Sequence, residues 1–288
     1  MLIKELYYES NYRSGGAPVT IDFLGDSVMA QDIETLFKSS WDYTESNYNT
    51  SHILGFYKKL QEKTLTVSIM AKDAKEYDRI MDRMHSAFEY DIRNVSPGKL
   101  WCNGFYLPCY ITETEYEDFE EFFEAVDKKL TISTERANWI KETKKEFFNS
   151  EQIEEQEDFL DFEYDFEYDF SADRQNRGSA ENKSVFPAEW GLVINGPAEN
   201  PQIQIGSTFV QVNTVVGDGE YLAIDSQKKT IVLTNVAGDK INKFGYRGTD
   251  GYVFRKIDTG INTVTWNGKF TWTLTILEER SEPRWKKE

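Results

Sequence analysis

The sequence predicts a mainly β protein with some α structure, and three observations lead to this prediction. After residue 185, eight short apolar runs alternate with Gly, Asn, Asp and Pro, which is typical of an all-β domain. Before residue 150, strand-like runs surround one segment with helical spacing, Asp73–Tyr90. Between them lies an acidic, aromatic segment, residues 151–173. We therefore expect an N-terminal β-structure over residues 1–150, a linker arm over 151–185 and a β-sandwich over 186–288.

Two kinds of period define the expected elements of the N-terminal part. Alternation of apolar and polar residues predicts strands, and apolar side chains at Tyr77, Met81 and Met84 predict an amphipathic helix packed on the sheet. Residues 25–60 cannot be assigned, and residues 115–126 are ambiguous between helix and strand. The expected strands are Ile3–Tyr8, Val19–Phe23 after a turn at 14–18, Thr64–Met70, Thr131–Thr134 and Trp139–Phe148.

The segment 99–108 carries the strongest local signal, an Asn-Gly pair between two apolar runs. Such a pair favours a two-residue hairpin turn. This turn would pair Cys102 with Phe105 and place Cys109 opposite Gly98. The two cysteines are then not cross-strand partners, so we expect no disulfide.

The C-terminal part predicts a sandwich or jelly roll built from short strands. Near its end, a two-residue turn at Asn267-Gly268 would mismatch the faces of the flanking runs. A three-residue loop would match Val264 with Phe270, so we expect a glycine bulge at Gly268. The expected strands are Trp190–Ile194, Gln202–Ile205, Thr208–Val216, Tyr221–Ile224, Thr230–Asn235, Tyr252–Ile257, Thr263–Trp266 and Phe270–Leu277.

The linker arm has strict period-two alternation over residues 161–170. In an extended chain this pattern places five carboxylates on one face and five aromatic rings on the other, over about 33 Å. The alternative is a solvated acidic linker. The polar residues 173–183 that follow are expected to form a flexible hinge. The acids are Asp161, Glu163, Asp165, Glu167 and Asp169, and the aromatic residues are Phe162, Tyr164, Phe166, Tyr168 and Phe170.

The charge balance excludes several classes of protein. The chain holds 33 Lys and Arg against 50 Asp and Glu, a formal net charge of −17. Proteins that wrap phosphate backbones or dock on anionic lipids concentrate Lys and Arg on one face. Residues 151–173 hold 11 acids and no Lys or Arg, whereas residues 186–288 balance at 12 against 12. The acidity therefore marks the arm, and neither nucleic-acid recognition nor membrane binding is expected.

The remaining composition predicts a folded protein of a reducing compartment. Hydrophobic residues make up 39% and aromatic residues 15% of the chain, enough for a sizeable core. No run approaches the length of a membrane span, and the first ten residues lack an apolar signal segment. Two cysteines are too few for a disulfide framework, which suits the cytosol.

Residues that carry chemistry are scarce. The sequence has no phosphate-binding loop, no dinucleotide fingerprint and no nucleophile elbow. Two histidines and two cysteines do not support a transition-metal site, and the aligned acids of the arm do not converge as Ca²⁺ ligands do. A carboxylate pair for glycoside hydrolysis is conceivable, but nothing selects two of the 50 acids. Trp190, Trp266 and Trp272 could stack on sugars, although aromatic residues at strand spacing more often form core. We expect no catalytic residue, metal or cofactor.

Four stretches of the sequence resemble the distal tail protein family of siphophages, and together they cover both halves of the chain in the family's order. One departure is the segment 115–126, which is more acidic and helix-like than a strand of that family. The stretches are LWCNGFYLPCYI (100–111), LDFEYDFEYDF (160–170), INGPAENPQIQI (194–205) and GEYLAIDSQKKTI (219–231). The residues matching the family's structural motifs are Gly196, Pro197, Asn200, Pro201, Gly219, Glu220 and Asp225.

The resemblance implies a virion structural protein, assembled in the host cytoplasm and placed at the tail tip. The family's N-terminal domain, a split barrel or sandwich with one helix, forms a hexameric ring that continues the tail tube. Its C-terminal domain is a galectin-like β-sandwich that carries baseplate or receptor-binding proteins. DNA would only pass through the ring lumen. In this setting the arm, with Asp161, Asp165 and Asp169 on its outer face, would bridge the two domains or touch a neighbouring protomer. The alternatives are a carbohydrate-binding accessory module and a cell-wall hydrolase.

Overall fold

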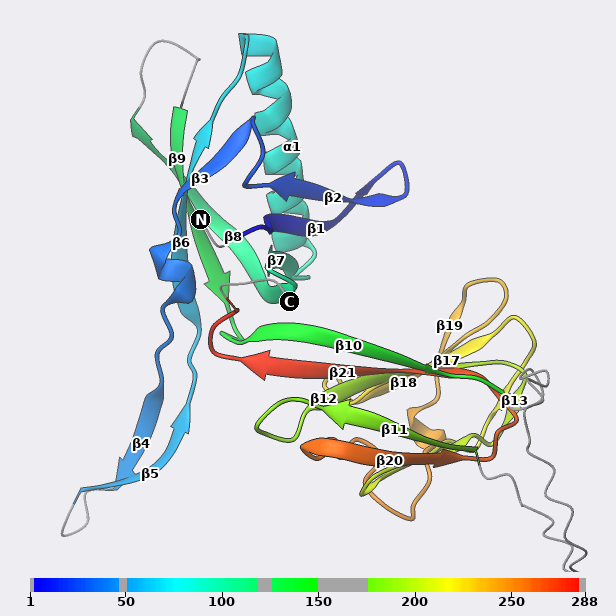
Figure 1. Cartoon of the computed structure of the whole chain (residues 1–288). Helices are drawn as coiled ribbons and strands as arrows, with labels where there is room; N and C mark the ends of the chain where they lie inside the picture. Colours follow the sequence, from blue (N-terminus) through cyan, green and yellow to red (C-terminus); the bar gives the residue numbers. More distant parts are fainter. Residues whose placement is uncertain (1–2, 47–50, 119–125, 150–175, 285–288) are drawn as a thin grey trace, which may run out of the picture. The chain divides into compact units, whose positions relative to one another are not determined.

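The computed structural model describes residues 3–46, 51–118, 126–149 and 176–284 (Figure 1). These residues form many antiparallel strands and one α-helix, which confirms the predicted mainly β class. The chain divides into two compact units, one of residues 1–141 and 279–288, the other of residues 142–278. Both boundaries fall inside strands, β10 and β21. The first unit is therefore discontinuous in sequence, whereas the second unit and the predicted parts are each continuous.

The first unit is built on one antiparallel sheet with the strand order β2-β1-β7-β8-β9-β6-β3. The strand β8 is long enough to pair with β7 along its first residues and with β9 along the rest. A separate hairpin, β4–β5, follows the 3-10 helix η1 (Glu34–Phe37). The strands of this unit are β1 (Leu6–Ser14), β2 (Ala17–Asp22), β3 (Val28–Asp32), β4 (Asp42–Ser46), β5 (His52–Tyr57), β6 (Gln61–Ile69), β7 (Gly98–Cys102), β8 (Phe105–Asp118) and β9 (Val126–Thr134).

The β7–β8 hairpin has the predicted register. Cys102 pairs with Phe105 and Gly98 with Cys109, and both cysteines are free and buried. The turn residues have positive φ angles, 48° at Asn103 and 81° at Gly104, as an Asn-Gly hairpin turn requires. The prediction of this hairpin, and of the absence of a disulfide between its cysteines, is confirmed.

The helix α1 (Ala74–Arg93) lies against β1 and β8 and confirms the predicted amphipathic segment, which it extends by three residues. Asp73 caps its first turn by accepting a hydrogen bond from the Glu76 N–H at 2.7 Å. No helix in the described part of the chain is both long and apolar enough to cross a membrane. The buried side chains of α1 are Tyr77, Met81, Met84, Ala87, Phe88 and Asp91.

A buried carboxylate, Asp91, fixes the end of the helix to the sheet. It accepts hydrogen bonds from the Tyr8 hydroxyl at 2.7 Å and from the Asn11 backbone N–H at 2.9 Å. Gly98 is required beside them, because a Cβ there would lie 2.2 Å from the Tyr8 hydroxyl oxygen. Burial, together with the negative charge of Asp91, raises the pKa of Tyr8 well above its ordinary value.

The second unit is a sandwich of two antiparallel sheets with a shared apolar core. One sheet has the order β19-β18-β17-β12-β21-β10 and the other β11-β20-β14-β15. A short pair, β13–β16, and the 3-10 helix η3 (Phe244–Tyr246) complete it. The strands are β10 (Trp139–Phe147), β11 (Asn176–Asn182), β12 (Glu189–Asn195), β13 (Ala198–Glu199), β14 (Gln202–Ile205), β15 (Thr208–Gln211), β16 (Val215–Val216), β17 (Tyr221–Asp225), β18 (Thr230–Thr234), β19 (Lys240–Asn242), β20 (Gly260–Trp266) and β21 (Trp272–Arg280).

The prediction of a flexible hinge at residues 173–183 is wrong for residues 176–182, which the structure describes as a strand. Residues 176–182 form β11, which pairs with β20 along its whole length. Despite its polar composition, this strand has an inner face made of small residues. Ala180 and Asn182 are buried, and Gly178 lies under the Phe147 ring. Backbone pairing and small inward residues, rather than large apolar ones, make this strand.

Three further expectations in the second unit are wrong. The run Thr208–Val216 is divided, with β15 and β16 in different sheets. Residues Tyr252–Ile257 form no strand: Val253 and Phe254 are both buried although adjacent, which an alternating strand does not allow. The glycine bulge between β20 and β21 does not occur, because these strands belong to opposite sheets.

Gly268 does have the positive φ that the predicted loop required, 75°. Its loop turns the chain from one sheet to the other rather than back along the same sheet. Trp266 and Trp272 meet across this corner with ring centroids 5.8 Å apart at 80°. Alternation fixes which side chains point inward but not which sheet a strand joins.

Candidate functional site

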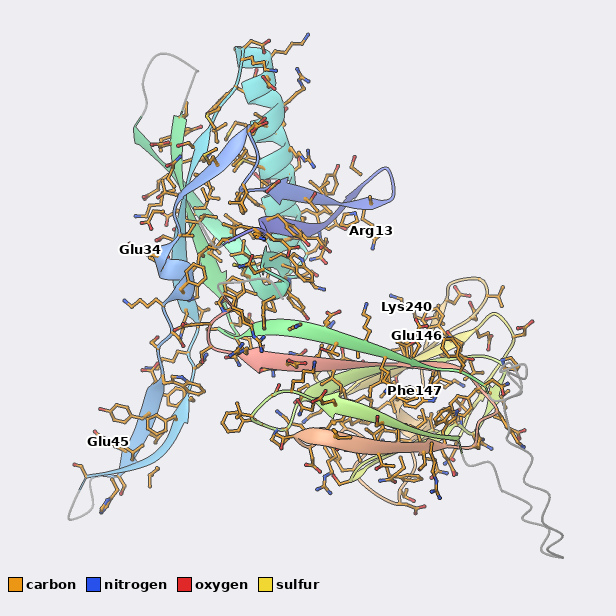
Figure 2. The ribbon with its side chains drawn as sticks, viewed as in Figure 1. Arg13, Glu34, Glu45, Glu146, Phe147 and Lys240 are labelled. Carbon is orange, nitrogen blue, oxygen red and sulfur yellow. The ribbon has the colours of Figure 1, made fainter. Side chains whose placement is uncertain are left out.

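Among the described residues of the first unit, exposed large apolar side chains gather on the hairpin β4–β5, whose side chains Figure 2 draws around the labelled Glu45. Its strands pair with each other and with no other strand in the described ranges. Every residue of β5 is exposed, including Leu54 at 68% and Phe56 at 63%. The exposed large side chains on and beside the hairpin are Trp41, Tyr43, Ile53, Leu54, Phe56, Tyr57 and Leu60.

Apolar side chains occur on both faces of the hairpin. Tyr43 and Phe56 are cross-strand partners whose rings meet edge to face at 6.4 Å, while Tyr57 alternates to the opposite face from Phe56. An isolated two-stranded hairpin is at best marginally stable in water, and contiguous exposed apolar surface marks interaction sites. The hairpin therefore has the character of an element that a partner covers.

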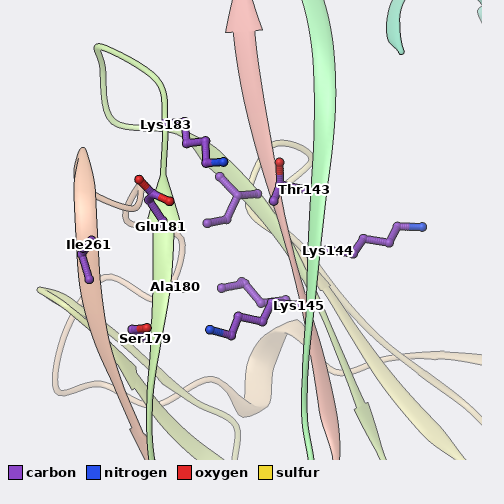
Figure 3. Close-up of a pocket in the computed structure, with 10 residues that line it drawn as sticks. Thr143, Lys144, Lys145, Ser179, Ala180, Glu181, Lys183 and Ile261 are labelled. Carbon is purple, nitrogen blue, oxygen red and sulfur yellow. The ribbon is translucent and has the colours of Figure 1, made fainter. Parts of the chain in front are cut away.

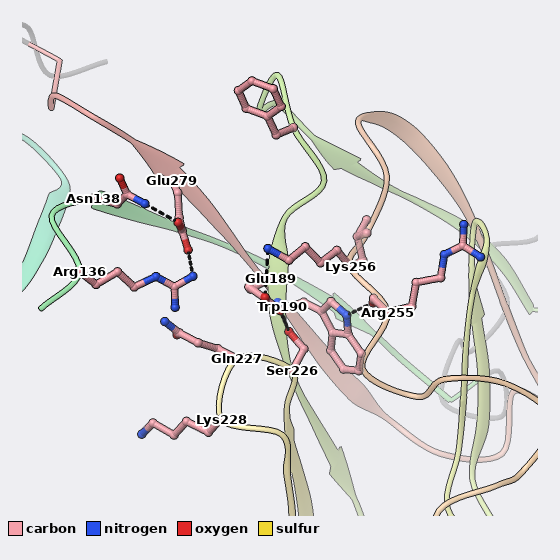
Figure 4. A network of polar contacts seen from close by, with 12 residues as sticks. Arg136, Asn138, Glu189, Trp190, Ser226, Gln227, Lys228, Arg255, Lys256 and Glu279 are labelled. Atoms are coloured by element: carbon pink, nitrogen blue, oxygen red, sulfur yellow. Dashed lines mark hydrogen bonds and ion pairs between the residues drawn. The ribbon is translucent and has the colours of Figure 1, made fainter. Parts of the chain in front are cut away.

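The root of the hairpin is held by polar contacts within the first unit. The Lys58 ammonium donates to the Ala137 carbonyl at 2.8 Å, to Asn138 Oδ1 at 2.7 Å and to Ser281 Oγ at 3.1 Å. Asn138 in turn donates to Glu279, which also accepts from Arg136 at 2.6 Å (Figure 4). These contacts fix where the hairpin leaves the sheet.

Two adjacent lysines at this root have opposite environments. Burial lowers the pKa of Lys58, and the negative charge of Glu279 opposes this shift. Lys59 is exposed, and its hydrogen bond and charge interaction with Asp42, at 3.1 Å, raise its pKa. Lys58 also lies over the Trp41 ring, 4.8 Å from its centroid. Lys58 is thus part of the fold, whereas Lys59 belongs to the surface.

Groups with the usual chemistry of active sites are not gathered in the described residues. No cluster of three or more His, Cys, Asp or Glu side chains there could hold a metal ion. Burial raises the pKa of the Cys102 thiol to about 12 and that of Cys109 above its ordinary value, so neither is an activated nucleophile. A cavity of about 310 Å³ between the β2–β3 connection and α1 is lined by residues such as Asp26, Arg83 and Met84 and contains no His or Cys.

Six of the seven predicted structural motif residues meet at one corner of the second unit. A Cβ at Gly196 would lie 1.8 Å from the Gly217 carbonyl oxygen, so only glycine fits. The Gly196 N–H donates to the Glu220 carbonyl at 2.9 Å, and the Glu220 carboxylate accepts from the Gly217 N–H at 2.8 Å. Gly196 and Pro197 are joined by a cis peptide bond, and Asn200 and Gly219 have positive φ angles.

The remaining contacts of this motif set are also structural. Asn200 donates its N–H to the Thr214 carbonyl, and the Pro201 carbonyl accepts from Val212. Asp225 lies apart from the corner, in the β17–β18 turn, where its carboxylate accepts from two backbone N–H groups. We find a role in backbone geometry for these residues and no ligand chemistry.

The three tryptophans considered for sugar stacking are core residues. Trp190 and Trp272 are fully buried, and Trp266 is 9% exposed. The Trp190 indole donates to the Arg255 carbonyl at 2.8 Å, beside the Ser226 hydroxyl that donates to Glu189 (Figure 4). A role in stacking on a carbohydrate therefore loses its support.

The interface arm of the sequence prediction, including Asp161, Phe162, Tyr164, Asp165, Phe166, Tyr168, Asp169 and Phe170, lies outside the described residues. Its role stays a prediction. The β4–β5 hairpin was missed because residues 25–60 show no regular alternation. The feature of the sequence that could have indicated this hairpin is the cluster of apolar residues at 53–57 next to two lysines. This composition favours a contact surface over a core strand.

The fold has counterparts among solved structures. The SPP1 Dit protein, described as a paradigm of the hub adsorption apparatus of phages infecting Gram-positive hosts, matches 96% of this chain and 98% of its own, with 8% identity and a TM-score of 0.57. The chain has the Dit fold. Chains of the phage P2 baseplate with Ca and of the phage p2 baseplate with Sr, both in the activated conformation, match 97% of this chain and 99% of their own. Their identities are 11% and 13%, and their TM-scores 0.61 and 0.60.

The similarity to Dit concerns the fold, since the identities are too low to carry function. No protein-family model matches the chain, and no curated protein matches it either. The resemblance inferred from the four sequence stretches is thereby confirmed at the level of architecture. It spans both compact units, because nearly the whole chain is covered in each comparison.

Proposed function

We propose that this chain is a structural protein of a phage tail tip, without catalytic activity, that assembles into a hexameric hub ring. The ring would join the tail tube to baseplate or receptor-binding proteins, as a virion component assembled in the host cytoplasm. The observation that carries the proposal is the Dit fold over nearly the full length of both chains, described for SPP1 as part of a hub.

The exposed hairpin supports an assembly role. An apolar element anchored at a polar root but uncovered along its length is costly for a monomer, because its rings stay in water. A second copy of the chain is the partner we propose for it. In a closed ring the same patch is covered on every protomer. A head-to-tail contact forms such a ring only when the rotation between neighbouring protomers adds up to a full turn.

The charge distribution suits a ring that surrounds DNA without binding it. Residues 1–150 carry 18 basic and 26 acidic side chains, a net of −8. A lumen of negative potential repels phosphates and would let the duplex slide. Reversing acids that face the lumen to Lys should slow DNA ejection from assembled particles, and an unchanged rate would remove this account of the acidity.

Mass measurement combined with negative-stain imaging of the full chain tests the proposed function. We expect particles of six protomers with six-fold symmetry when the chain is purified or co-expressed with a tail-tube protein. A chain that stays monomeric in both preparations, or that forms a closed assembly of another order, would contradict the hexameric hub. Digestion of host cell wall by the purified chain would contradict the non-catalytic role.

A further inference from the structure

Exposed aromatic side chains gather on the second unit, in and beside η3. Tyr246 and Tyr252 are 52% and 59% exposed, and Phe244 is exposed as well. The Phe244 ring stacks on the buried Phe254 ring at 5.9 Å, and the Tyr252 ring meets Phe254 edge to face at 6.0 Å. A group of exposed apolar side chains in mutual contact marks an interaction site.

Two cations lie over these rings. The Arg247 guanidinium carbon is 4.3 Å from the centroid of the Phe244 ring, and the same side chain donates to the Phe244 carbonyl at 3.0 Å. The Lys243 ammonium is 4.6 Å from the centroid of the Tyr246 ring. The ring faces attract these cations, which holds both charges at the surface. We call the three exposed rings, together with Lys243 and Arg247, the aromatic–basic face.

The backbone of this face is anchored to the strands beside it. The Lys243 N–H donates to the carbonyl of Ile231, in β18, at 2.8 Å. The Tyr246 carbonyl accepts from the N–H of Asn213, in the connection from β15 to β16, at 2.7 Å. Ordering a flexible surface costs free energy on association, so a surface fixed in this way loses less when a partner binds.

The face is basic within an acidic chain. Residues 239–256 hold five Lys and Arg against two acids, a net of +3, whereas the whole chain has a net charge of −17. Lys256 pairs with Glu189 at 3.1 Å, while Arg247 and Arg255 are exposed. A positive surface of this kind is complementary to a partner that carries carboxylates.

A groove of about 320 Å³ between β10 and β11 is another basic region of this unit (Figure 3). Lys144, Lys145 and Lys183 line it, but none of the described residues that line it is aromatic. The side chains that contribute most to protein–protein binding are enriched in Trp, Tyr and Arg. The aromatic–basic face has this composition and the groove does not, so the region of the groove provides the matched controls below.

We propose that the aromatic–basic face binds an acidic segment of a partner protein, one that carries apolar side chains between its carboxylates. The carboxylates pair with Arg247 and Lys243, and Arg offers two parallel N–H groups to a carboxylate. The apolar side chains cover the rings of Tyr246 and Tyr252, which are otherwise in water. This inference goes beyond the proposed hub, because it assigns a further partner to the second unit by itself.

The ring faces favour a protein segment over a glycan or a single-stranded nucleic acid. Bases and sugars stack on free ring faces, whereas cations lie over the rings of Phe244 and Tyr246. The neighbouring amides that could bind a sugar are used within the chain. Asn242 Oδ1 accepts from the Phe244 N–H at 2.9 Å, and Asn213 Oδ1 accepts from the Gln211 side chain at 3.0 Å. Carboxylates that approach the two cations from solvent fit this geometry better than a stacked ring.

Binding of synthetic polymers to the full chain tests the proposal. The probe is a random copolymer of glutamate and tyrosine, and the comparison polymers are polyglutamate, oligothymidylate and hyaluronan. In about 0.1 M salt the long-range repulsion from the net charge of the chain is screened. We expect the copolymer to bind, polyglutamate to bind about tenfold more weakly, and the other two polymers not to bind.

Two outcomes of this titration would overturn the proposal. One is the absence of binding by the copolymer. The other is tighter binding of oligothymidylate or hyaluronan than of the copolymer, which would assign the face to a nucleic acid or a glycan.

Substitution of the exposed rings locates the binding. Tyr246→Ser with Tyr252→Ser should weaken copolymer binding about tenfold or more and leave the chain folded, because both side chains are more than half exposed. The matched control, Val185→Ser with Phe186→Ser, removes two side chains in the β11–β12 connection that are still more exposed, and it should leave the affinity unchanged. An equal loss of affinity in the two variants would contradict binding at the face.

Reversal of one charge tests the contribution of the cations. Arg247→Glu should weaken copolymer binding about tenfold, since it removes the guanidinium that pairs with a carboxylate. The matched control is Lys183→Glu, which changes the net charge equally at an exposed residue of the groove and should have little effect. Equal effects of the two substitutions would overturn the assignment to Arg247. All these titrations can be made on a monomer, so their failure would leave the proposed hub standing.

Discussion

Two hairpins of the first unit have similar apolar composition and opposite environments. In β7–β8, Leu100 and Cys102 are fully buried and alternate with half-buried residues, because one face of the hairpin belongs to the apolar core of the first unit. In β4–β5, every residue of β5 is exposed although Ile53, Leu54 and Phe56 are as apolar as their buried counterparts. Apolar composition therefore indicates how much a hairpin would be stabilised by burial. It does not indicate whether the burying surface belongs to the same chain or to a partner.

The largest expected effect is in the buried hairpin. Leu100→Ala removes a fully buried side chain from the core of the first unit and should lower the free energy of unfolding by about 3 kcal/mol. Chemical denaturation measures this loss. A loss below about 1 kcal/mol would mean that the site collapses around the smaller side chain and that burial in β7 is not decisive.

The pH dependence of stability is expected to depend on the same hairpin. Burial raises the pKa of Cys102 from 9.0 to about 12, so the unfolded chain loses this proton first as the pH rises. The contribution is therefore complete below pH 9 and is lost between about pH 9 and pH 12, by roughly 1.4 kcal/mol at pH 10. Denaturation at pH 8 and pH 10, compared with Cys102→Ala, isolates this thiol. An equal pH dependence in the variant would show that other groups cause it.

A smaller and local effect is expected at the root of the exposed hairpin. Lys58→Met removes three hydrogen bonds. It should lower the free energy of local opening of β4–β5 by about 1 kcal/mol, which hydrogen exchange of the amides of these strands measures. The matched control is Lys59→Met, which breaks an exposed ion pair with Asp42 and should leave the same exchange nearly unchanged. Equal effects of the two substitutions would contradict the assignment of Lys58 to the fold.

The smallest effect on monomer stability is expected along the exposed hairpin itself. Phe56→Ser replaces a side chain that is 63% exposed and should change the free energy of unfolding of the monomer by about 0.5 kcal/mol or less. Denaturation of dilute protein measures it. A loss comparable to that of Leu100→Ala would show that the chain itself covers Phe56.

Local signals predicted the elements that local forces determine. The Asn-Gly pair fixed the β7–β8 register because few residues other than Asn and Gly adopt the positive φ angles of that turn. The helix was readable from the spacing of its apolar residues, and the structure adds Asp73 as its N-cap. The strand β11 was not, because its inner face is formed by Gly178, Ala180 and a hydrogen-bonded Asn182 rather than by large apolar residues.

The candidate surface could be predicted only in part. The motif residues around Gly196 and Glu220 are recognisable because close backbone approach restricts which residues fit. The β4–β5 hairpin is not, since its apolar residues are exposed and show no core-directed period. A groove such as that between β10 and β11 arises from the pairing of distant strands, which alternation along one strand does not encode.

The most direct test of the central claim, that the exposed hairpin is an assembly surface, is the mass of the double variant Leu54→Ser with Phe56→Ser. It should be compared with the unmodified chain at equal concentration, by mass photometry or analytical ultracentrifugation. We predict a folded monomer for the variant where the unmodified chain forms a six-membered ring. A variant that assembles into the same ring would contradict the claim.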